Sequence, residues 1–335
     1  MTFINTFYLQ LSSSLNSGLA LFIIVILTLL CLLAVPTVLS FIFPIFKVKE
    51  NKTKGFSFYL YAFSTGFFIV LATFGFLRES IETVAENAET NELSTTAIYA
   101  WNAGVLVIGL LLGITFSFFL KFVITARINK RLQKDGTMSV FVHSHDHGEH
   151  SHPDYIFTQD EAQENAEKAV LNNTNPMLKV IALLLLLTHR IPEGILLGYN
   201  LQLAANGNND SLTIAYFISL IVHLIPEETI FYFRLREAKF SPIQALLLSF
   251  LGLSLFLPFM LIGAYAGQWI AETWWLKAIM FSTIAGIFLF TSIVEFIPEF
   301  YHRDLSKKTW FVVLISVFAG IIFAAIVLSF HAHSH

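Results

Sequence analysis

The chain has 335 residues, of which 56% are hydrophobic and 15% aromatic, whereas only 13% are charged. A soluble domain carries a much larger share of charged residues, so this composition excludes an ordinary soluble protein and indicates a polytopic membrane protein. The net charge of −3 is uninformative about nucleic acid, but the sequence has no basic stripe interleaved with aromatic residues that would support such a partner.

Apolar windows follow one another along nearly the whole chain, each long enough to cross a hydrocarbon core of ~30 Å as a helix. The sequence therefore predicts an all-α integral membrane protein with eight transmembrane helices. The expected spans are residues 19–45, 57–77, 97–124, 177–203, 212–233, 241–270, 276–299 and 310–330. Prolines inside these windows are expected to kink the helices, because proline donates no backbone hydrogen bond. They are Pro36, Pro192, Pro226, Pro258 and Pro298.

Lysine and arginine are concentrated in alternate loops, which sets the expected orientation. The loops after the first, third, fifth and seventh spans carry clusters of basic residues, whereas the loop over residues 78–96 is rich in glutamate. The basic loops are therefore predicted to be cytoplasmic, and both termini extracytoplasmic. We expect a multi-pass protein of the cell membrane, in contact with the lipid bilayer.

The one long polar segment, residues 125–176, lies between the third and fourth spans and is predicted to be cytoplasmic. Its length and polarity favour a flexible insertion within a single transmembrane domain of residues 1–335. Alternating histidines in such a loop are able to bind Zn²⁺ weakly, although a dispensable solvated tract remains the alternative. These histidines are His143, His145, His147, His150 and His152.

The fourth and fifth spans carry nearly the same polar string, His189-Arg190-Ile191-Pro192-Glu193 and His223-Leu224-Ile225-Pro226-Glu227. Charged groups at such depth cost roughly 2.5–3.5 kcal/mol each on insertion scales, which favours a functional role. Histidine and glutamate four residues apart share one helical face.

His189 lies about a dozen residues into its span, roughly 18 Å from its start, which is near mid-membrane. Because the two spans run antiparallel, the two pairs are able to face each other and form a His2Glu2 site. Such a site suits Zn²⁺, Fe²⁺, Mn²⁺ or Cd²⁺ as a transported substrate. A polar network that only holds two helices together is the simpler alternative, but a facing duplicate pair makes it less favoured.

These motifs resemble those of the ZIP (Zrt/Irt-like) divalent-metal transporters, and the likeness extends over the whole chain. His189-x-x-Pro192-Glu193-Gly194 is similar to the motif of helix 4, and His223-x-x-Pro226-Glu227 to that of helix 5. The resemblance implies a 3+2+3 arrangement, with two three-helix repeats around the helix 4–5 pair. It also implies metal import into the cytoplasm and primary ligands at His189, Glu193, His223 and Glu227. Zinc is the favoured ion.

The chain departs from the pattern of bacterial family members that hold two metals, which have polar residues after the two motif histidines. Here those positions are Arg190 and Leu224, and residues 241–270 contain no carboxylate. We therefore expect the Arg190 guanidinium to replace the charge of a second ion and to pair with Glu227 or Glu228. Glu228 is an additional candidate ligand.

Two further features are assigned secondary roles. Glu295 and Glu299 lie one turn apart near the cytoplasmic end of the seventh span, where they are expected to guide the ion out or to pair with Arg303. The small residues Gly109 and Gly113 predict a close helix contact, either within the chain or in a homodimer.

Two rival functions share the same ligands. An intramembrane metallohydrolase would use them to activate water, and a receptor or sensor would bind metal without conducting it. Transport is favoured over both, and no enzymatic activity is expected, because the ligands lie at mid-membrane on kinked helices. Metal flux in proteoliposomes separates the three.

Overall fold

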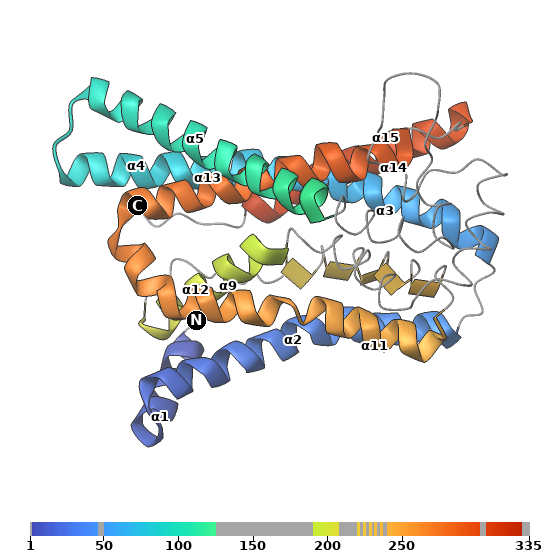
Figure 1. Ribbon diagram of the computed structural model, residues 1–335, viewed down its shortest axis with the longest axis horizontal. Coiled ribbons are helices and arrows are strands. Elements are labelled where there is room, and N and C mark those ends of the chain that lie inside the picture. The colour runs from blue at the N-terminus through green and yellow to red at the C-terminus, as the bar shows by residue number, and fades with distance from the viewer. Residues whose placement is uncertain are drawn as a thin grey trace.

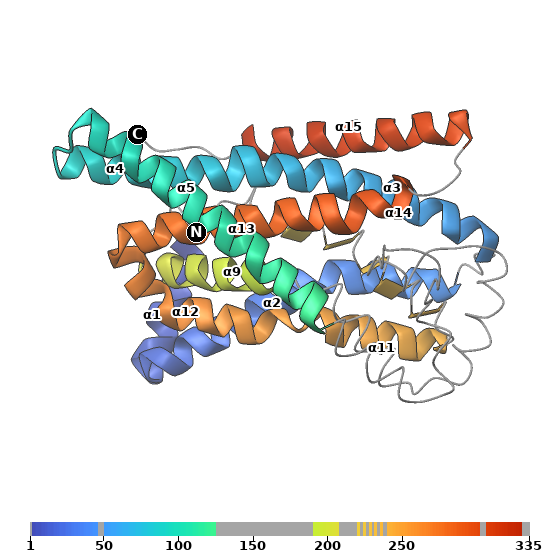
Figure 2. The same cartoon turned by 45° about the horizontal axis from the view of Figure 1, so that its top comes forward.

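In the computed structural model, the described residues are 2–45, 50–124, 190–207, 240–301 and 306–329, with pairs of residues between 220 and 236. These ranges form helices and contain no strand, and most of the long helices run side by side along the long axis of the molecule (Figures 1 and 2). The first part of the chain contains α1 (Thr2–Ser14), α2 (Ser17–Ile45), α3 (Glu50–Val70), the π-helical η1 (Leu71–Leu77), α4 (Arg78–Thr90), α5 (Thr95–Phe118) and the π-helical η2 (Phe119–Ile124). The later part contains α9 (Arg190–Ala205), α11 (Pro242–Leu253), α12 (Phe256–Glu272), α13 (Trp274–Phe290), the π-helical η5 (Thr291–Phe296), α14 (Ile297–Tyr301) and α15 (Lys307–Ser329).

Six helical stretches in the described residues are long and apolar enough to cross a membrane, and they coincide with six of the eight predicted spans. They are Ser17–Val38, Tyr59–Thr90, Thr95–Phe118, Pro242–Glu272, Trp274–Val294 and Lys307–Ser329. The fourth and fifth predicted spans are only partly described. The protein is therefore a multi-pass helical membrane protein, while the count of eight spans stays a prediction.

The outward faces of these helices are apolar, as contact with lipid requires. α5 exposes Leu111 and Phe118 by more than half, and α15 exposes Phe311, Phe318 and Ile322 to a similar degree. In water such a continuous apolar surface would drive aggregation. In a bilayer it faces acyl chains without penalty.

The acidic segment predicted as a loop over residues 78–96 is mostly helical, which corrects the sequence-based expectation. The second span continues without a break through η1 into α4, which ends at Thr90. Arg78 and Glu82 lie one turn apart and form an ion pair at 2.6 Å, an arrangement that supports helix formation. The chain then turns at residues 91–94, where the Ser94 side chain accepts a hydrogen bond from the Ala97 amide and starts α5.

The prolines of the sixth and seventh spans are associated with breaks in helical geometry. α11 ends at Leu253, and α12 begins at Phe256, two residues before Pro258. Proline at 258 cannot donate to the carbonyl one turn earlier, so the predicted kink is present. Pro298 is the second residue after η5, whose wider π-helical turns are a common accommodation of a missing hydrogen bond. In contrast, α2 continues through Pro36.

The buried side chains form two main apolar cores, and α9 contributes to both. One core joins α3, α13 and α15 and includes Leu196 and Tyr199 of α9. The other joins α2, α12 and Leu224 and includes Leu197 and Leu201 of α9. Almost every side of α9 is therefore covered by protein. The 3+2+3 arrangement stays a prediction. The two cores show which described helices contact one another, but they do not show that the chain contains two similar three-helix units.

Close helix pairs are built on glycine. A Cβ at Gly198 of α9 would collide with the Met260 carbonyl oxygen, and one at Gly263 of α12 would collide with the Ile195 carbonyl oxygen. The backbones of α9 and α12 are thus in direct contact. α5 and α13 pack in the same way, since a Cβ at Gly113 would meet the Thr283 carbonyl oxygen. The predicted small-residue contact is confirmed within the chain, so this face is not free for a homodimer.

α1 was not expected as a helix, and it docks on the end of α9. Its Ile4, Phe7 and Tyr8 pack against the core that contains α2 and α9. The Asn5 side-chain amide donates a 2.6 Å hydrogen bond to the Ala205 carbonyl at the end of α9. A carbonyl in the last turn of a helix has no partner within that helix, so Asn5 satisfies it. Figure 1 shows α1 at an angle to α2 beside this end of the molecule.

Candidate metal centre

α9 carries two ionisable side chains in the protein interior. Arg190 is 0% exposed and Glu193 is 2% exposed. They lie one turn apart, and the Arg190 Nη1 atom is 3.8 Å from the Glu193 Oε2 atom. This separation makes them an ion pair, although it is longer than a hydrogen bond. Two opposite charges buried together cost far less than either alone.

The sequence offered Glu227 or Glu228 as a partner for Arg190, and only Glu228 belongs to the described residues. Glu228 of the fifth span is fully buried and lies within electrostatic range of the Arg190 guanidinium. Arg190 thus interacts electrostatically with two buried carboxylates, those of Glu193 and Glu228. The contact with Glu193 was not predicted, although the three-residue spacing would have allowed it.

An aromatic ring completes the environment of Arg190. The guanidinium carbon lies 4.8 Å from the centroid of the Phe256 ring, a cation–π distance. Phe256 begins α12 and is itself 0% exposed. Sequence reasoning missed Phe256, because nothing distinguishes one ring in an apolar run. The sequence offered one indirect indication, since a buried guanidinium needs an aromatic or acidic side chain beside it.

The described positions of the fifth span follow one helical face. Leu220, Leu224, Glu228 and Leu235 are all buried, at spacings of four, four and seven residues. Thr229 donates its hydroxyl to the Ile225 carbonyl at 2.7 Å, as in a helix. Glu228 therefore faces the protein interior, and its role as a ligand stays a prediction.

The remaining predicted site residues are not described. Outside the described residues lie His189, His223, Glu227, His143, His145, His147, His150 and His152. Glu295 and Glu299 belong to η5 and α14, but their side chains are also outside the description. Among the residues that are described, no group of three or more histidine, cysteine, aspartate or glutamate side chains is placed to hold a metal ion. The four-ligand site stays a prediction.

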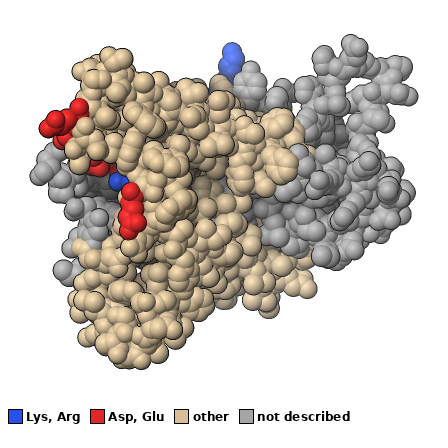
Figure 3. All heavy atoms as spheres, turned by 60° about the vertical axis from the view of Figure 1, so that its left-hand side comes forward, with Lys and Arg blue, Asp and Glu red and all other residues tan. Residues whose placement is uncertain are grey.

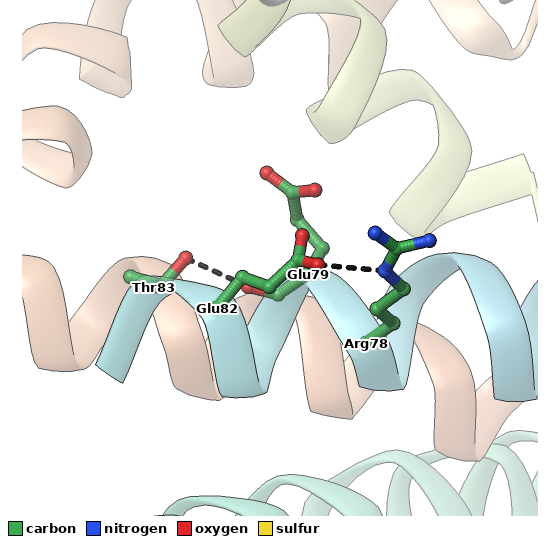
Figure 4. A network of polar contacts seen from close by, with 4 residues as sticks. All are labelled: Arg78, Glu79, Glu82 and Thr83. Carbon is green, nitrogen blue, oxygen red and sulfur yellow. Dashed lines mark hydrogen bonds and ion pairs between the residues drawn. The ribbon is translucent and has the colours of Figure 1, made fainter. Parts of the chain in front are cut away.

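Acidic residues gather at the end of the molecule where α4 and α5 project. Glu79 and Glu86 of α4 lie within electrostatic range of Tyr199, which is farther along α9 than Glu193. Figure 3 shows acidic side chains on a face that otherwise has little charge. Figure 4 shows Glu79 directed away from the α4 axis, while Arg78 bonds Glu82. A divalent cation approaching this end of α9 meets a negative potential.

These observations define a multi-pass membrane protein with buried charges on a helix at its centre. The model of the ZIP zinc transporter family matches residues 14–328, which is nearly the full chain. The chain belongs to this family, whose members transport divalent metals, typically zinc, and are not enzymes. No curated protein matches the chain significantly.

Proposed function

We propose that the protein imports zinc into the cytoplasm through a mid-membrane site formed by His189, Glu193, His223 and Glu227. The observation that carries the proposal is the Glu193 carboxylate, which is buried beside Arg190 on a helix covered by protein on almost every side. Ionisable groups at this depth of a membrane protein mark substrate pathways. Iron, manganese and cadmium are the alternative substrates.

Two imidazoles and two carboxylates suit this role chemically. Nitrogen and oxygen ligands bind Zn²⁺ in tetrahedral sites, and all of them must be deprotonated to do so. Protons therefore compete with the metal, and uptake is expected to weaken as the pH falls. Pro192 and Pro226, one residue before each glutamate, remove one helical hydrogen bond each and let the backbone adjust as the ion passes.

Arg190 takes the place of a second metal ion in this proposal. Its guanidinium neutralises part of the charge of Glu193 and Glu228, with which it interacts. An arginine at this position stays charged under all physiological conditions. The centre is therefore expected to bind one ion, and a two-ion count by anomalous scattering would contradict this assignment.

The route on either side of the centre follows the charge pattern. The acidic face of α4 collects cations outside, and Glu295 and Glu299 receive the ion on the cytoplasmic side. The histidines of residues 143–152 form a weak acceptor near the exit, so deleting them should only modulate flux. The basic loops place both termini outside the cell membrane.

Uptake of Zn²⁺ into proteoliposomes tests the proposal. Glu193→Ala and Glu227→Ala should each abolish uptake, because each removes a ligand. The matched control is Glu272→Ala, which removes an exposed carboxylate from the end of α12 and should leave uptake unchanged. Equal flux in Glu193→Ala and wild type would remove the site assignment.

The same assay separates the two alternatives raised by the sequence. A sensor would bind zinc without flux, and an intramembrane hydrolase would show hydrolysis without flux. Family membership favours neither of them.

A further inference from the structure

Phe256 and Arg190 form a contact that the proposed metal site does not require. Both side chains are 0% exposed, and the guanidinium carbon lies 4.8 Å from the ring centroid. The ring comes from α12, whereas the guanidinium and Glu193 come from α9. A cation–π contact removed from water is a strong one, so the ring restricts where the guanidinium lies.

The packing of α9 against α12 keeps this ring in place. A Cβ at Gly194 would lie 2.8 Å from the Phe259 Cβ atom and 3.0 Å from the Phe256 carbonyl oxygen. The start of α12 is therefore in direct contact with α9, one residue beyond Glu193. The Phe256 ring and the Glu193 carboxylate therefore lie on directly packed segments of α12 and α9.

The Arg190 guanidinium therefore contacts the Phe256 ring and also lies near the Glu193 carboxylate. The Nη1 atom faces the Oε2 atom at 3.8 Å. A carboxylate engaged with a cation is a weaker ligand for a metal ion, so the guanidinium lowers the coordinating capacity of Glu193. The positive charge also repels any ion that approaches on that side.

We infer that Phe256 is a positioning residue that sets metal selectivity by keeping the Arg190 guanidinium beside the Glu193 carboxylate. The inference rests on the proposed function, in which Glu193 is a ligand. A carboxylate whose coordinating capacity is partly used by a guanidinium favours ions satisfied by four nitrogen and oxygen ligands, such as Zn²⁺. It disfavours Mn²⁺, which prefers octahedral oxygen-rich coordination.

Competitive uptake of Zn²⁺ and Mn²⁺ into proteoliposomes tests this inference. Phe256→Leu keeps an apolar side chain but removes the ring, so the Mn²⁺ to Zn²⁺ uptake ratio should rise about fivefold. Arg190→Gln should raise the ratio at least as much, because it removes the guanidinium itself. Phe256→Tyr retains the ring and should keep the wild-type ratio.

The double variant separates positioning from packing. Once Arg190→Gln has removed the guanidinium, adding Phe256→Leu should leave the ratio where Arg190→Gln alone places it. Phe288→Leu is the matched packing control, because Phe288 is 1% exposed and lies in the other core. It should lower thermal stability without changing the ratio.

The outcomes distinguish this inference from the function on which it rests. If Glu193→Ala leaves zinc uptake unchanged, the proposed site is wrong. If Glu193→Ala abolishes uptake but Phe256→Leu keeps the wild-type ratio, only the role of Phe256 is wrong. Should Phe256→Leu fail to fold, an unchanged ratio in Arg190→Gln overturns the inference by itself.

Discussion

The helix pairs α9–α12 and α5–α13 are packed by the same device but contain different chemistry. In both pairs, glycines bring one backbone against a carbonyl of the other helix. Among the described residues, the hydrogen bond between α5 and α13 is a neutral one, from the Ser282 hydroxyl to the Val105 carbonyl at 3.0 Å, and a pair of tryptophans, Trp101 and Trp274, adds a ring contact. The α9–α12 contact contains the Arg190 guanidinium on the Phe256 ring. Small residues therefore explain how helices approach in this protein, and buried charge distinguishes the pair to which we assign the proposed metal site.

The sharpest test of this contrast is to remove the buried cation. Arg190→Ala leaves the Glu193 and Glu228 carboxylates buried without their guanidinium, which should cost about 3–5 kcal/mol of stability. Thermal unfolding in detergent measures this loss. Zn²⁺ should partly restore the stability, because a bound divalent ion supplies positive charge to the same carboxylates. An Arg190→Ala protein as stable as wild type would remove the distinction between the two pairs.

Adding one methyl group to each of the two helix interfaces should separate an effect on stability from an effect on transport. Gly198→Ala and Gly113→Ala each place a Cβ against a carbonyl oxygen, so each should cost about 1–3 kcal/mol. Only Gly198→Ala should also slow zinc uptake per folded molecule, because it displaces α12 and Phe256 from α9. Uptake normalised to folded protein measures the difference. Equal slowing in both variants would mean that packing alone controls flux.

The neutral hydrogen bond of α5–α13 should be worth less than the charged contact. Ser282→Ala removes the donor to the Val105 carbonyl and should cost about 1 kcal/mol in thermal unfolding. Zinc uptake should not change. A loss of uptake in Ser282→Ala would assign function to a pair that we treat as structural.

The smallest effect is expected at the exposed ion pair on α4. Arg78 and Glu82 are 57% and 34% exposed, so Glu82→Gln should cost no more than about 0.5 kcal/mol. Its influence on uptake should appear only at low ionic strength, where the acidic face attracts cations over a longer range. Salt-dependent uptake rates check this, and a large loss of thermal stability would show that α4 depends on this pair.

The membrane spans could be predicted from sequence because they depend on composition and length alone. Six predicted windows coincide with observed helices, and the polar strings around Arg190 and Glu193 identified the buried charges. The loop predicted at residues 78–96 was wrong, since charge patterning was taken for a boundary although the residues favour a helix.

The contacts between neighbouring helices could not be predicted from the sequence. Nothing in the run around Phe256 distinguishes it from its apolar neighbours, so the ring beneath Arg190 emerges only when α9 and α12 are brought together. The same holds for Asn5, whose partner Ala205 is 200 positions away. Which helix faces which is a property of three-dimensional packing and not of the hydropathy pattern.

The docking of α1 provides a practical handle on the site helix. Because Asn5 is bonded to the end of α9, a spectroscopic label attached at the exposed Thr6 reports on the helix that carries Glu193 without entering the lipid-buried interior. With a second label on the α4–α5 hairpin, the distance between the two labels would measure how far α9 moves during a transport cycle.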